Sequence, residues 1–531
     1  MLKDNNAIKI NFNDNVAVAF EAITKGHTVF GAEALCDIPA GHKIALCDIP
    51  PAEQVIKYGY PIGSATDYIR SGDHVHTHNL KTNLSGIESY EYNPSFRKSD
   101  KEADEEKSKK TSEKIGSETT QNTFLGYRRT DGKAGIRNEI WIINTVGCVN
   151  KIAEKIARQA NQRFSSKIAG FGDQADSYSD RADSCNKNIE GVFTFVHPYG
   201  CSQLGDDHIY TQNILKNMVN HPNAAGVLIL GLGCENNSIE EFQKALGTWD
   251  DQRVKFLNAQ DVSDDVEAGL SLIEELISYA EGFQREPIPV GELVIGLKCG
   301  GSDGLSGITA NTLVGSLSDA ITAYGGSCLL TEVPEMFGAE TLLMDRCVSE
   351  EIFNKAVDLI NDFKQYFIRH GQAIYENPSP GNKDGGITTL EEKSLGCTQK
   401  GGFSPVTDVL NYGETLKHPG LNLLQGPGND IVAVTNLLAA GAHMVLFTTG
   451  RGTPLGGPVP TVKISSNTTL TQNKPHWIDF DAGVMVNDVD PAELAHKFFE
   501  HIINVAGGAV KTKNELNDYR EIAIFKDGVT L

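Results

Sequence analysis

The sequence lacks several features that would place it at once in a familiar class of protein. No apolar run approaches the roughly 20 residues of a membrane-spanning helix, and the first residues, MLKDNNAIKINFND, hold no apolar segment typical of a secretion signal. Its ten cysteines include no close CxxC pair, so we expect reduced thiols rather than a secreted disulfide framework. There is no P-loop pattern and no complete GxGxxG motif, so no nucleotide cofactor is predicted. These absences favour a cytoplasmic protein.

Positive charge is also scarce. The 531 residues include 69 aspartates and glutamates against 47 lysines and arginines, which gives a net charge of −22. Because nucleic acids and anionic membranes attract clustered Lys and Arg, neither is an expected partner. A small anionic substrate held in a local positive pocket is compatible with this charge, and so is a homo-oligomer. The length predicts two or three domains.

The first 90 residues predict a small, mostly β domain. Apolar and polar residues alternate, as in the segment Ile8–Phe12, and turn residues follow closely. The unit closes with GDHVHTHN, in which His74, His76 and His78 occupy alternate positions. In an extended chain alternate side chains share one face, so the three imidazoles would face one metal ion or anionic ligand. The alternative is an exposed polar edge strand without function.

The rest of the chain divides by composition. Residues 91–123 mix charges with almost no apolar side chains, so they predict a flexible linker. From residue 124, apolar strands alternate with helix-like segments, which predicts an α/β domain with a mainly parallel sheet over 124–385. A run of Pro and Gly near residue 380 predicts a boundary, followed by a C-terminal α/β domain over 386–531.

Four apolar, β-branched runs each end at a cysteine. Because the carboxyl ends of parallel strands lie at one edge of a sheet, where such folds bind ligands, we expect these thiols to meet. Thiolate and imidazole ligands favour iron or zinc, and the spacings are not those of a zinc ribbon. The alternative for each cysteine is a small buried hydrophobe. The four cysteines are Cys148, Cys201, Cys234 and Cys299, and the predicted metal ligands are His197, Cys201, Cys234 and Cys299.

Other polar residues follow the same strand ends. Glu235, Asp303 and Glu332 are candidates for a general base. For Glu332 and its neighbour Glu335, a salt-bridged rim is the equal alternative. Arg451 lies between two glycines, and its planar guanidinium suits a substrate carboxylate; the alternative is a solvated turn. The predicted substrate-binding residues are Ser302, Lys383, Thr449 and Arg451.

Several long motifs together resemble the altronate dehydratases, relatives of galactarate dehydratase and of the sulfolactate sulfo-lyases. They are HPYGCSQLGDDH, GVLILGLGCENN, CGGSDGLSGITAN, LTEVPEMFGAE, NPSPGNKDGGITTLEEKSLGCTQK and FTTGRGTP, and the resemblance covers nearly the whole chain except the charged linker. The first domain resembles a small β-clip called a SAF domain. Its GDHVHTHN is similar to the altronate branch, whereas galactarate dehydratases do not carry this segment. The resemblance implies a SAF-like β-clip followed by two α/β domains with mainly parallel sheets.

The resemblance also implies a reaction: loss of water from D-altronate to give 2-keto-3-deoxy-D-gluconate in galacturonate catabolism, with dependence on Fe²⁺ or Mn²⁺. Such an elimination needs a cation to absorb charge on the substrate, a base for the C2 proton and an acid for the departing C3 hydroxyl. His76 or His78 would act as ligand or general acid.

Other functions are also compatible with the residues. The chain could dehydrate galactarate or another sugar acid, or act as a sulfo-lyase. It could instead be a redox protein that carries an iron–sulfur cluster on three of the four strand-end cysteines, or a non-catalytic protein that binds sugar acids. In each of these readings except the redox protein, the partner is a small-molecule sugar acid or a close analogue.

Overall fold

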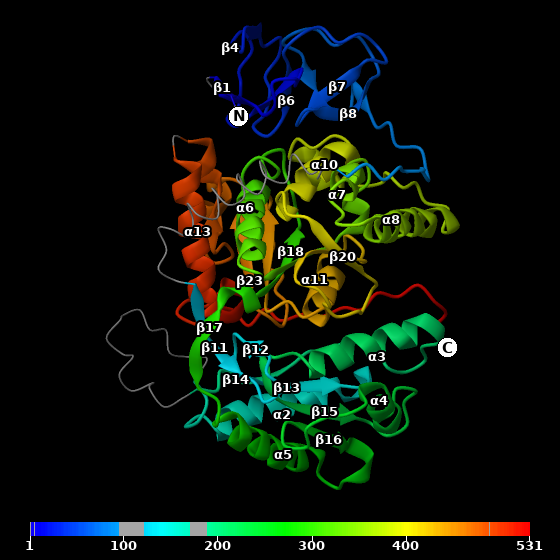
Figure 1. Cartoon of the computed structure of the whole chain (residues 1–531), viewed down its shortest axis with the longest axis vertical. Coiled ribbons are helices and arrows are strands. Elements are labelled where there is room, and N and C mark those ends of the chain that lie inside the picture. The colour runs from blue at the N-terminus through cyan, green and yellow to red at the C-terminus, as the bar shows by residue number, and fades with distance from the viewer. Residues whose placement is uncertain (1, 5, 95–121, 170–187, 488) are drawn as a thin grey trace.

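The chain is described by a computed structural model in which three domains stack along the longest axis of the molecule (Figure 1). The N-terminal domain lies at one end, the domain that follows it in sequence lies at the other, and the C-terminal domain lies between them. Most of the predicted linker, residues 95–121, falls outside the described residues. None of the helices within the described part of the chain is long and apolar enough to span a membrane. The structure describes residues 2–4, 6–94, 122–169, 188–487 and 489–531.

The first domain consists of short antiparallel strands. One sheet has the order β1-β2-β3-β6-β9, a second has the order β10-β8-β7, and β4 pairs with β5. Val55, Ile62 and Val75 form its core together with Leu395 from the C-terminal domain, so the two domains share apolar packing. The strands are β1 (Leu2–Asp4), β2 (Ala7–Lys9), β3 (Val16–Ala19), β4 (Thr28–Val29), β5 (Ala32–Glu33), β6 (Lys43–Ala45), β7 (Gln54–Lys57), β8 (Tyr60–Ala65), β9 (His74–Val75) and β10 (Leu80–Lys81).

The second domain contains a four-stranded parallel sheet in the order β14-β13-β15-β16 and a small antiparallel sheet in the order β12-β11-β17. Successive side chains of β13 point to opposite faces: Ile140 and Ile142 pack against α2 and α5, whereas Trp141 packs toward α3 and the C-terminal domain. The elements are β11 (Thr123–Arg128), β12 (Ala134–Gly135), β13 (Glu139–Asn144), η1 (Gly147–Val149), α2 (Asn150–Arg163), β14 (Gly191–Thr194), α3 (Gly205–Val219), β15 (Ala224–Gly231), α4 (Ile239–Leu246), β16 (Val254–Asn258), η3 (Ala259–Asp261), α5 (Asp265–Ala280) and β17 (Arg285–Pro289).

The third domain contains a seven-stranded parallel sheet in the order β20-β21-β19-β18-β22-β23-β24. Helices α6, α8 and α13 cover one face, and α11 covers the other. The elements are η4 (Val290–Glu292), β18 (Val294–Cys299), α6 (Ala310–Ala323), β19 (Ser327–Leu330), η5 (Val333–Glu335), α7 (Glu340–Met344), α8 (Glu350–Arg369), α9 (Pro380–Asp384), α10 (Leu390–Cys397), η6 (Thr398–Gly401), β20 (Val406–Leu410), β21 (Gly420–Leu424), α11 (Asp430–Ala439), β22 (Met444–Thr449), β23 (Thr461–Ser465), α12 (Thr468–Asn473), β24 (Phe480–Asp481), η7 (Gly483–Val486), α13 (Pro491–Ala506) and α14 (Lys513–Leu516).

The predicted fold class is confirmed, since an antiparallel β domain precedes two domains with parallel sheets. The boundary predicted between residues 385 and 386 does not separate two domains. Strands β18 and β19, which precede it, pair with β22 and β21, which follow it, in one sheet. The Pro-Gly run near residue 380 forms the short helix α9 and a loop. Pro and Gly indicate a turn, but they do not determine which strands pair on either side of it.

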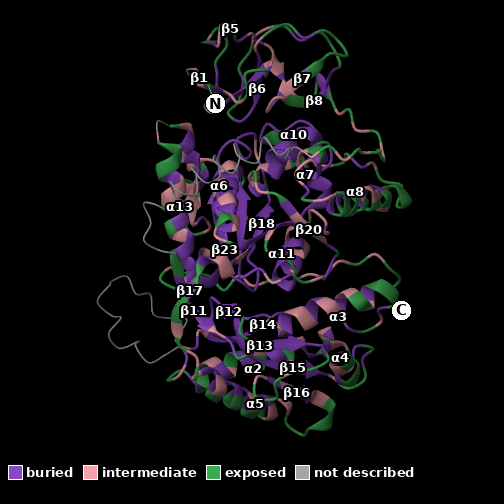
Figure 2. Cartoon of the chain, viewed as in Figure 1, coloured by how far each residue is buried: buried purple, intermediate pink, exposed green. Residues whose placement is uncertain are grey.

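Buried residues are concentrated in the strands of both parallel sheets and in helix α10 (Figure 2). The strands are buried because helices cover both faces of each sheet. Helix α10 is different, since all eight of its residues are buried although three carry a charge. It packs against β8 of the first domain and against η5 and η6 of the third. This buried polar helix marks the region in which the two domains meet.

Candidate functional site

Glu392 of α10 forms ion pairs across the interface between the third and first domains. Glu392 accepts from the Lys43 and Lys57 ammonium groups of the first domain, each at 2.8 Å. All three side chains are almost fully buried, and buried charges are tolerated only when paired. Burial would raise the pKa of the Glu392 carboxyl, but the two ammonium groups outweigh it and lower this pKa to about 2. The pairs fasten the first domain to the third.

Four imidazole rings of the first domain gather beside these ion pairs. The Nδ1 atom of His42 lies 3.0 Å from the Nε2 atom of His74. Ring centroids of contacting members lie 4.8 to 5.6 Å apart. We call this group the histidine cluster, and its members are His42, His74, His76 and His78. The structure therefore brings the three predicted histidines together and adds His42, which the sequence analysis missed.

The histidine cluster contacts the loop of the third domain that follows α9. His42 Nε2 lies 3.2 Å from the carbonyl oxygen of Asp384, and His76 Nδ1 lies 3.1 Å from the hydroxyl of Thr388. Lys383, a predicted substrate-binding residue, directly precedes Asp384 and is half-buried. The first domain thus presents its imidazoles to residues of the third.

The imidazoles of His42, His74 and His76 are neutral at neutral pH. Burial lowers the pKa of His74 to about 3, with a further contribution from the neighbouring His42. Burial, followed by the positive charge of Lys43, lowers the pKa of His76 to about 4. Burial also lowers the pKa of His42. A neutral imidazole is the form that binds a divalent metal or accepts a proton.

Two strand-end loops of the third domain come together next to this cluster. The backbone N–H groups of Gly450 and Arg451 donate to the carbonyl oxygen of Gly301, at 3.0 and 2.8 Å. These contacts join the loop after β18 to the loop after β22. The predicted residues that they bring side by side are Ser302, Asp303, Thr449 and Arg451.

The same loops touch the first domain. Gly304 N donates to the carbonyl oxygen of Gly385 at 2.8 Å, and a Cβ atom on Gly304 would lie only 1.9 Å from the carbonyl oxygen of Gly41. Only glycine permits so close an approach of two backbones. Gly41 directly precedes His42 in the sequence. The predicted residues of the third domain and the histidine cluster therefore line one interface.

Some side chains at this interface already have hydrogen-bond partners, and others do not. The hydroxyl of Ser302 is buried without a hydrogen-bond partner among the described residues, so it is available to a substrate oxygen. The Asp303 carboxylate accepts from the hydroxyls of Ser306 and Ser466, each at 2.8 Å, and from Asn467 at 3.0 Å. It therefore holds the loops together. The Arg451 side chain is exposed. A cavity of about 10 Å³, enough for one water molecule, lies beside Ser302 and is also lined by Cys397.

Behind this interface lies a buried group of thiols and carboxylates. Cys299 Sγ lies 3.2 Å from Cys397 Sγ, and both sulfur atoms lie within 3.3 Å of Glu335 Oε2. These three residues have the spacing of metal ligands. The contact with Cys299, together with burial, raises the pKa of the Cys397 thiol well above its usual value.

Three lysines already supply this buried group with positive charge. Lys400 Nζ lies 2.9 Å from Cys299 Sγ and 3.2 Å from Glu332, and Lys298 also pairs with Glu332. Lys393 pairs with Glu335 at 2.9 Å. Burial would raise the pKa of Glu335, but these ammonium groups hold it well below its usual range. Because like charges repel, a divalent cation is disfavoured here.

The structure does not bring the predicted metal ligands together. Cys201, Cys234 and His197 lie in the second domain, whereas Cys299 ends β18 in the third. No three of the four predicted ligands lie within 4.8 Å of one another among the described residues. Strand ends share an edge only within one sheet, and the sequence pattern did not show that these strands belong to two sheets.

In the second domain, the predicted ligand His197 and the predicted base Glu235 both form hydrogen bonds that hold local structure. His197 is buried, with Nε2 2.9 Å from the carbonyl oxygen of Asn144 and Nδ1 accepting from Tyr199 N at 3.1 Å. Both of its nitrogens are therefore engaged. Glu235 accepts from Thr145 Oγ1 at 2.7 Å and from the backbone N–H groups of residues 232 and 233. It is not free to act as a base.

Several residues at the interface escaped the sequence analysis. His42 and Lys43 lie in the segment Pro39–Lys43, which predicted only a turn. Cys397 and Glu392 lie within the motif NPSPGNKDGGITTLEEKSLGCTQK, whose length was a signal although none of its residues after Lys383 was singled out. Periodicity does not show which charges become buried, because burial here depends on a partner domain.

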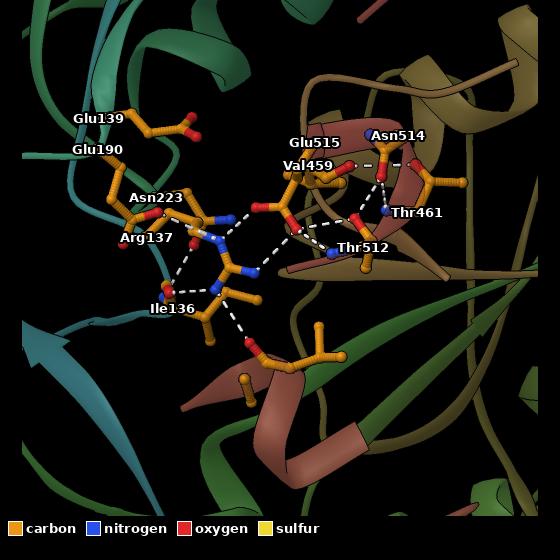
Figure 3. Close-up of polar contacts among 12 residues, drawn as sticks. Ile136, Arg137, Glu139, Glu190, Asn223, Val459, Thr461, Thr512, Asn514 and Glu515 are labelled. Atoms are coloured by element: carbon orange, nitrogen blue, oxygen red, sulfur yellow. Dashed lines mark hydrogen bonds and ion pairs between the residues drawn. The ribbon is translucent and has the colours of Figure 1, made fainter. Parts of the chain in front are cut away.

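A second group of buried carboxylates lies where the second and third domains meet (Figure 3). Glu139, Glu190 and Glu515 also have the spacing of metal ligands. Arg137 fills the centre of this group: its Nε atom lies 2.6 Å from Glu515 and 3.3 Å from Glu190. Arg520 pairs with Glu139 at 3.1 Å. Because the guanidinium groups supply the positive charge, we interpret this group as a structural ion-pair cluster.

The fold and the interface define a class: a three-domain protein in which a small β domain covers the strand-end loops of a parallel α/β domain. Models of three domains match the chain. They are the altronate/galactarate dehydratase SAF domain (residues 5–83), the D-galactarate dehydratase/altronate hydrolase second domain (126–281) and the D-galactarate/altronate dehydratase C-terminal domain (290–530). The chain belongs to the altronate/galactarate dehydratase family.

Curated relatives agree with this family over the full length. The chain is 53% identical over 529 residues to an altronate dehydratase of Bacillus subtilis (strain 168) and 51% identical over 528 residues to that of Escherichia coli (strain K12), with 99% of each chain covered. It is 31% identical over 552 residues to a galactarate dehydratase (L-threo-forming) of Escherichia coli (strain K12), with 98% of this chain and 96% of the relative covered.

Proposed function

We propose that this chain is a hydro-lyase that removes water from D-altronate to give 2-keto-3-deoxy-D-gluconate, at the interface of the histidine cluster with the third domain. The observation that carries the proposal is the histidine cluster held against the loop after α9, which in turn contacts the loop that bears Ser302. Identity to two relatives described as altronate dehydratases, at 51–53%, supports altronate over galactarate, for which the relative is 31% identical.

The donor set fits a divalent cofactor, for which we propose Fe²⁺ with Mn²⁺ as the alternative. His42 Nδ1 and His74 Nε2, which lie at hydrogen-bonding distance from each other, 3.0 Å, would hold the ion. Both imidazoles are neutral, as metal binding requires. When bound, the ion supplies positive charge that stabilises negative charge developing on the substrate carboxylate.

The loops of the third domain bind and orient the sugar acid. The exposed guanidinium of Arg451 binds a carboxylate, because its planar donors match two oxygens. The unpartnered hydroxyl of Ser302 binds a substrate hydroxyl, and Thr449 and Lys383 flank the same region. Closure of the first domain over these loops excludes water from the reacting atoms.

Histidines of the first domain move the protons. We assign removal of the C2 proton to His76, whose imidazole is neutral and able to accept a proton. The predicted carboxylate bases Asp303, Glu235 and Glu332 are each engaged by several donors. The electron pair of the C2–H bond forms the C2–C3 double bond, and the C3–O bond breaks. His78, exposed at the rim of the cluster, protonates the departing hydroxyl, which leaves as water. The enol then tautomerises to the 2-keto acid.

The test uses metal-stripped full-length protein. D-Altronate is supplied with Fe²⁺, Mn²⁺, Zn²⁺ or Mg²⁺ added back separately, and formation of 2-keto acid is followed. We expect Fe²⁺ or Mn²⁺ to restore turnover. Galactarate and sulfolactate are assayed in parallel. Product from galactarate or sulfolactate but none from altronate would refute the proposed substrate.

A matched pair of variants tests the location. His42→Ala is expected to lose both bound Fe²⁺, measured by equilibrium dialysis, and turnover. His418→Ala is the control, because this exposed histidine precedes β21 and therefore lies at the opposite edge of the sheet from the strand-end loops. Full Fe²⁺ binding by His42→Ala would contradict the ligand assignment, whatever its rate.

A further inference from the structure

Three cysteines that take no part in the proposed reaction follow adjacent strands of the second domain. Cys148 follows β13, Cys201 follows β14 and Cys234 follows β15. In the sheet β14 and β15 flank β13, and all three strands run parallel. Their carboxyl ends therefore lie at the same edge. The topology brings three thiols from separate loops to this edge.

Hydrogen bonds tie the three loops to one another. Gly147 N, next to Cys148, donates to the carbonyl oxygen of Tyr199 at 2.9 Å. Asn237 N, in the loop that contains Cys234, donates to the carbonyl oxygen of Gly200 at 3.0 Å. The neighbours of each cysteine are thus in direct contact with another cysteine's loop.

Two further contacts fix the loop that carries Cys201. Ser202 N donates to Asn236 Oδ1 at 3.0 Å. Gly200 has φ +96°, and a Cβ atom there would lie 1.9 Å from the carbonyl oxygen of Thr145. Only glycine permits this approach, so the residue before Cys201 is pressed against the loop that carries Cys148.

The three thiols are exposed, which is unusual for cysteine. Cys328 and Cys347 of the third domain, in contrast, are buried as small apolar residues. An exposed group of three cysteines contributes nothing to a core. Among the described residues, the three sulfur atoms are not all within 4.8 Å of one another, so one ion alone would not bridge them.

We propose that Cys148, Cys201 and Cys234 are the ligands of an iron–sulfur cluster. Such clusters are held by cysteine thiolates, so each thiol releases its proton as it binds iron. A cluster in which several irons share sulfides spaces its thiolates more widely than a single ion does, so it does not require the three sulfurs to lie within 4.8 Å of one another. The described residues at this edge supply three cysteines, so one iron of a cubane cluster would take its remaining ligand from outside this set. The centre lies in the second domain and is separate from the histidine cluster.

The test measures the cluster and not the turnover of a sugar acid. Full-length protein is purified without oxygen, reconstituted with Fe²⁺ and sulfide, and assayed for iron, acid-labile sulfide and visible charge-transfer absorbance. We expect iron and sulfide in equal amounts. Cys148→Ser, Cys201→Ser and Cys234→Ser should each lower cluster-bound iron by about tenfold or more. His42→Ala, which removes the proposed Fe²⁺ ligand, should leave sulfide and absorbance unchanged.

Controls separate ligand loss from misfolding. Cys36→Ser and Cys47→Ser remove exposed thiols of the first domain and should retain the absorbance of the parent protein. Circular dichroism of the three second-domain variants should match the parent. Protein that binds iron without sulfide, binds zinc alone, or keeps its full absorbance in all three variants would overturn the proposal.

Discussion

Buried ion pairs join the third domain to each of its two neighbours, but the two interfaces differ in the side chains that lie beside these pairs. Toward the second domain, Arg137 donates to Glu515 and to the carbonyl oxygens of Ile136 and Val505, so its donors are used within the protein (Figure 3). Toward the first domain, the ion pairs of Glu392 are equally complete, but neutral imidazoles lie beside them. An interface whose buried charges are all paired is stabilised by them, whereas neutral imidazoles at an interface can also bind a metal ion or exchange a proton. Buried polar residues can therefore stabilise an interface, as at Arg137, or be available for chemistry, as we propose for the histidine cluster.

The largest expected effect is at the interface of the first and third domains, where the histidine cluster lies. His76→Ala should lower kcat for altronate by about 10²- to 10⁴-fold, the usual contribution of a general base. Its denaturant midpoint should remain within error of the parent, because the His76 side chain is only half-buried. Steady-state kinetics and urea unfolding measure the two quantities. An unchanged kcat would remove His76 from the reaction.

The reverse pattern is expected at the other interface. Arg137→Met leaves Glu515 buried without its ion-pair partner, whereas Glu190 keeps Arg285. Loss of one partner of a buried pair costs about 3–5 kcal/mol in the free energy of unfolding. The kcat per folded molecule should not change, since the histidine cluster is untouched. Thermal unfolding and active-site titration test this. A variant as stable as the parent would show that the ion-pair cluster does not hold the two domains.

Acid should weaken both interfaces over the same pH range. Arg137 outweighs burial and lowers the pKa of Glu515 to about 2, and the two lysines do the same for Glu392. Because these folded-state pKa values lie below the unfolded value near 4.5, stability is fully present above about pH 4.5 and is lost as pH falls toward 2. Each group contributes about 3 kcal/mol by this linkage. Urea midpoints between pH 7 and pH 2.5 measure the loss, and Arg137→Met should flatten the profile.

The smallest effect is expected away from either interface. Ser238 caps α4 by accepting from Glu241 N, and Ser238→Ala should cost about 1 kcal/mol of stability. Turnover should be unaffected, because α4 lies in the second domain. The measurement is again urea unfolding with kinetics alongside. A change in kcat would show that the second domain affects turnover, and would contradict the assignment of the reaction to the interface of the first and third domains alone.

Local sequence patterns predicted much of the architecture and part of the site. Alternating apolar residues predicted the β domain, and strands that alternate with helix-like segments predicted parallel sheets. The spacing of His74, His76 and His78 predicted a group of imidazoles, and strand-end turns predicted Ser302, Asp303, Thr449 and Arg451. The structure confirms the β domain and the parallel sheets and brings these residues to one interface, because strand periodicity and turn chemistry are properties of a few neighbouring residues. The roles of the site residues stay predictions.

Only the tertiary structure decided how the pieces combine. It divided the four strand-end cysteines between two sheets, joined strands from both sides of residue 385 in one sheet, and placed His42 and Glu392 at the same interface. It also engaged His197 and Glu235 in local hydrogen bonds. Strand pairing and burial of charge depend on contacts between residues hundreds of positions apart, and periodicity along the chain carries no record of them.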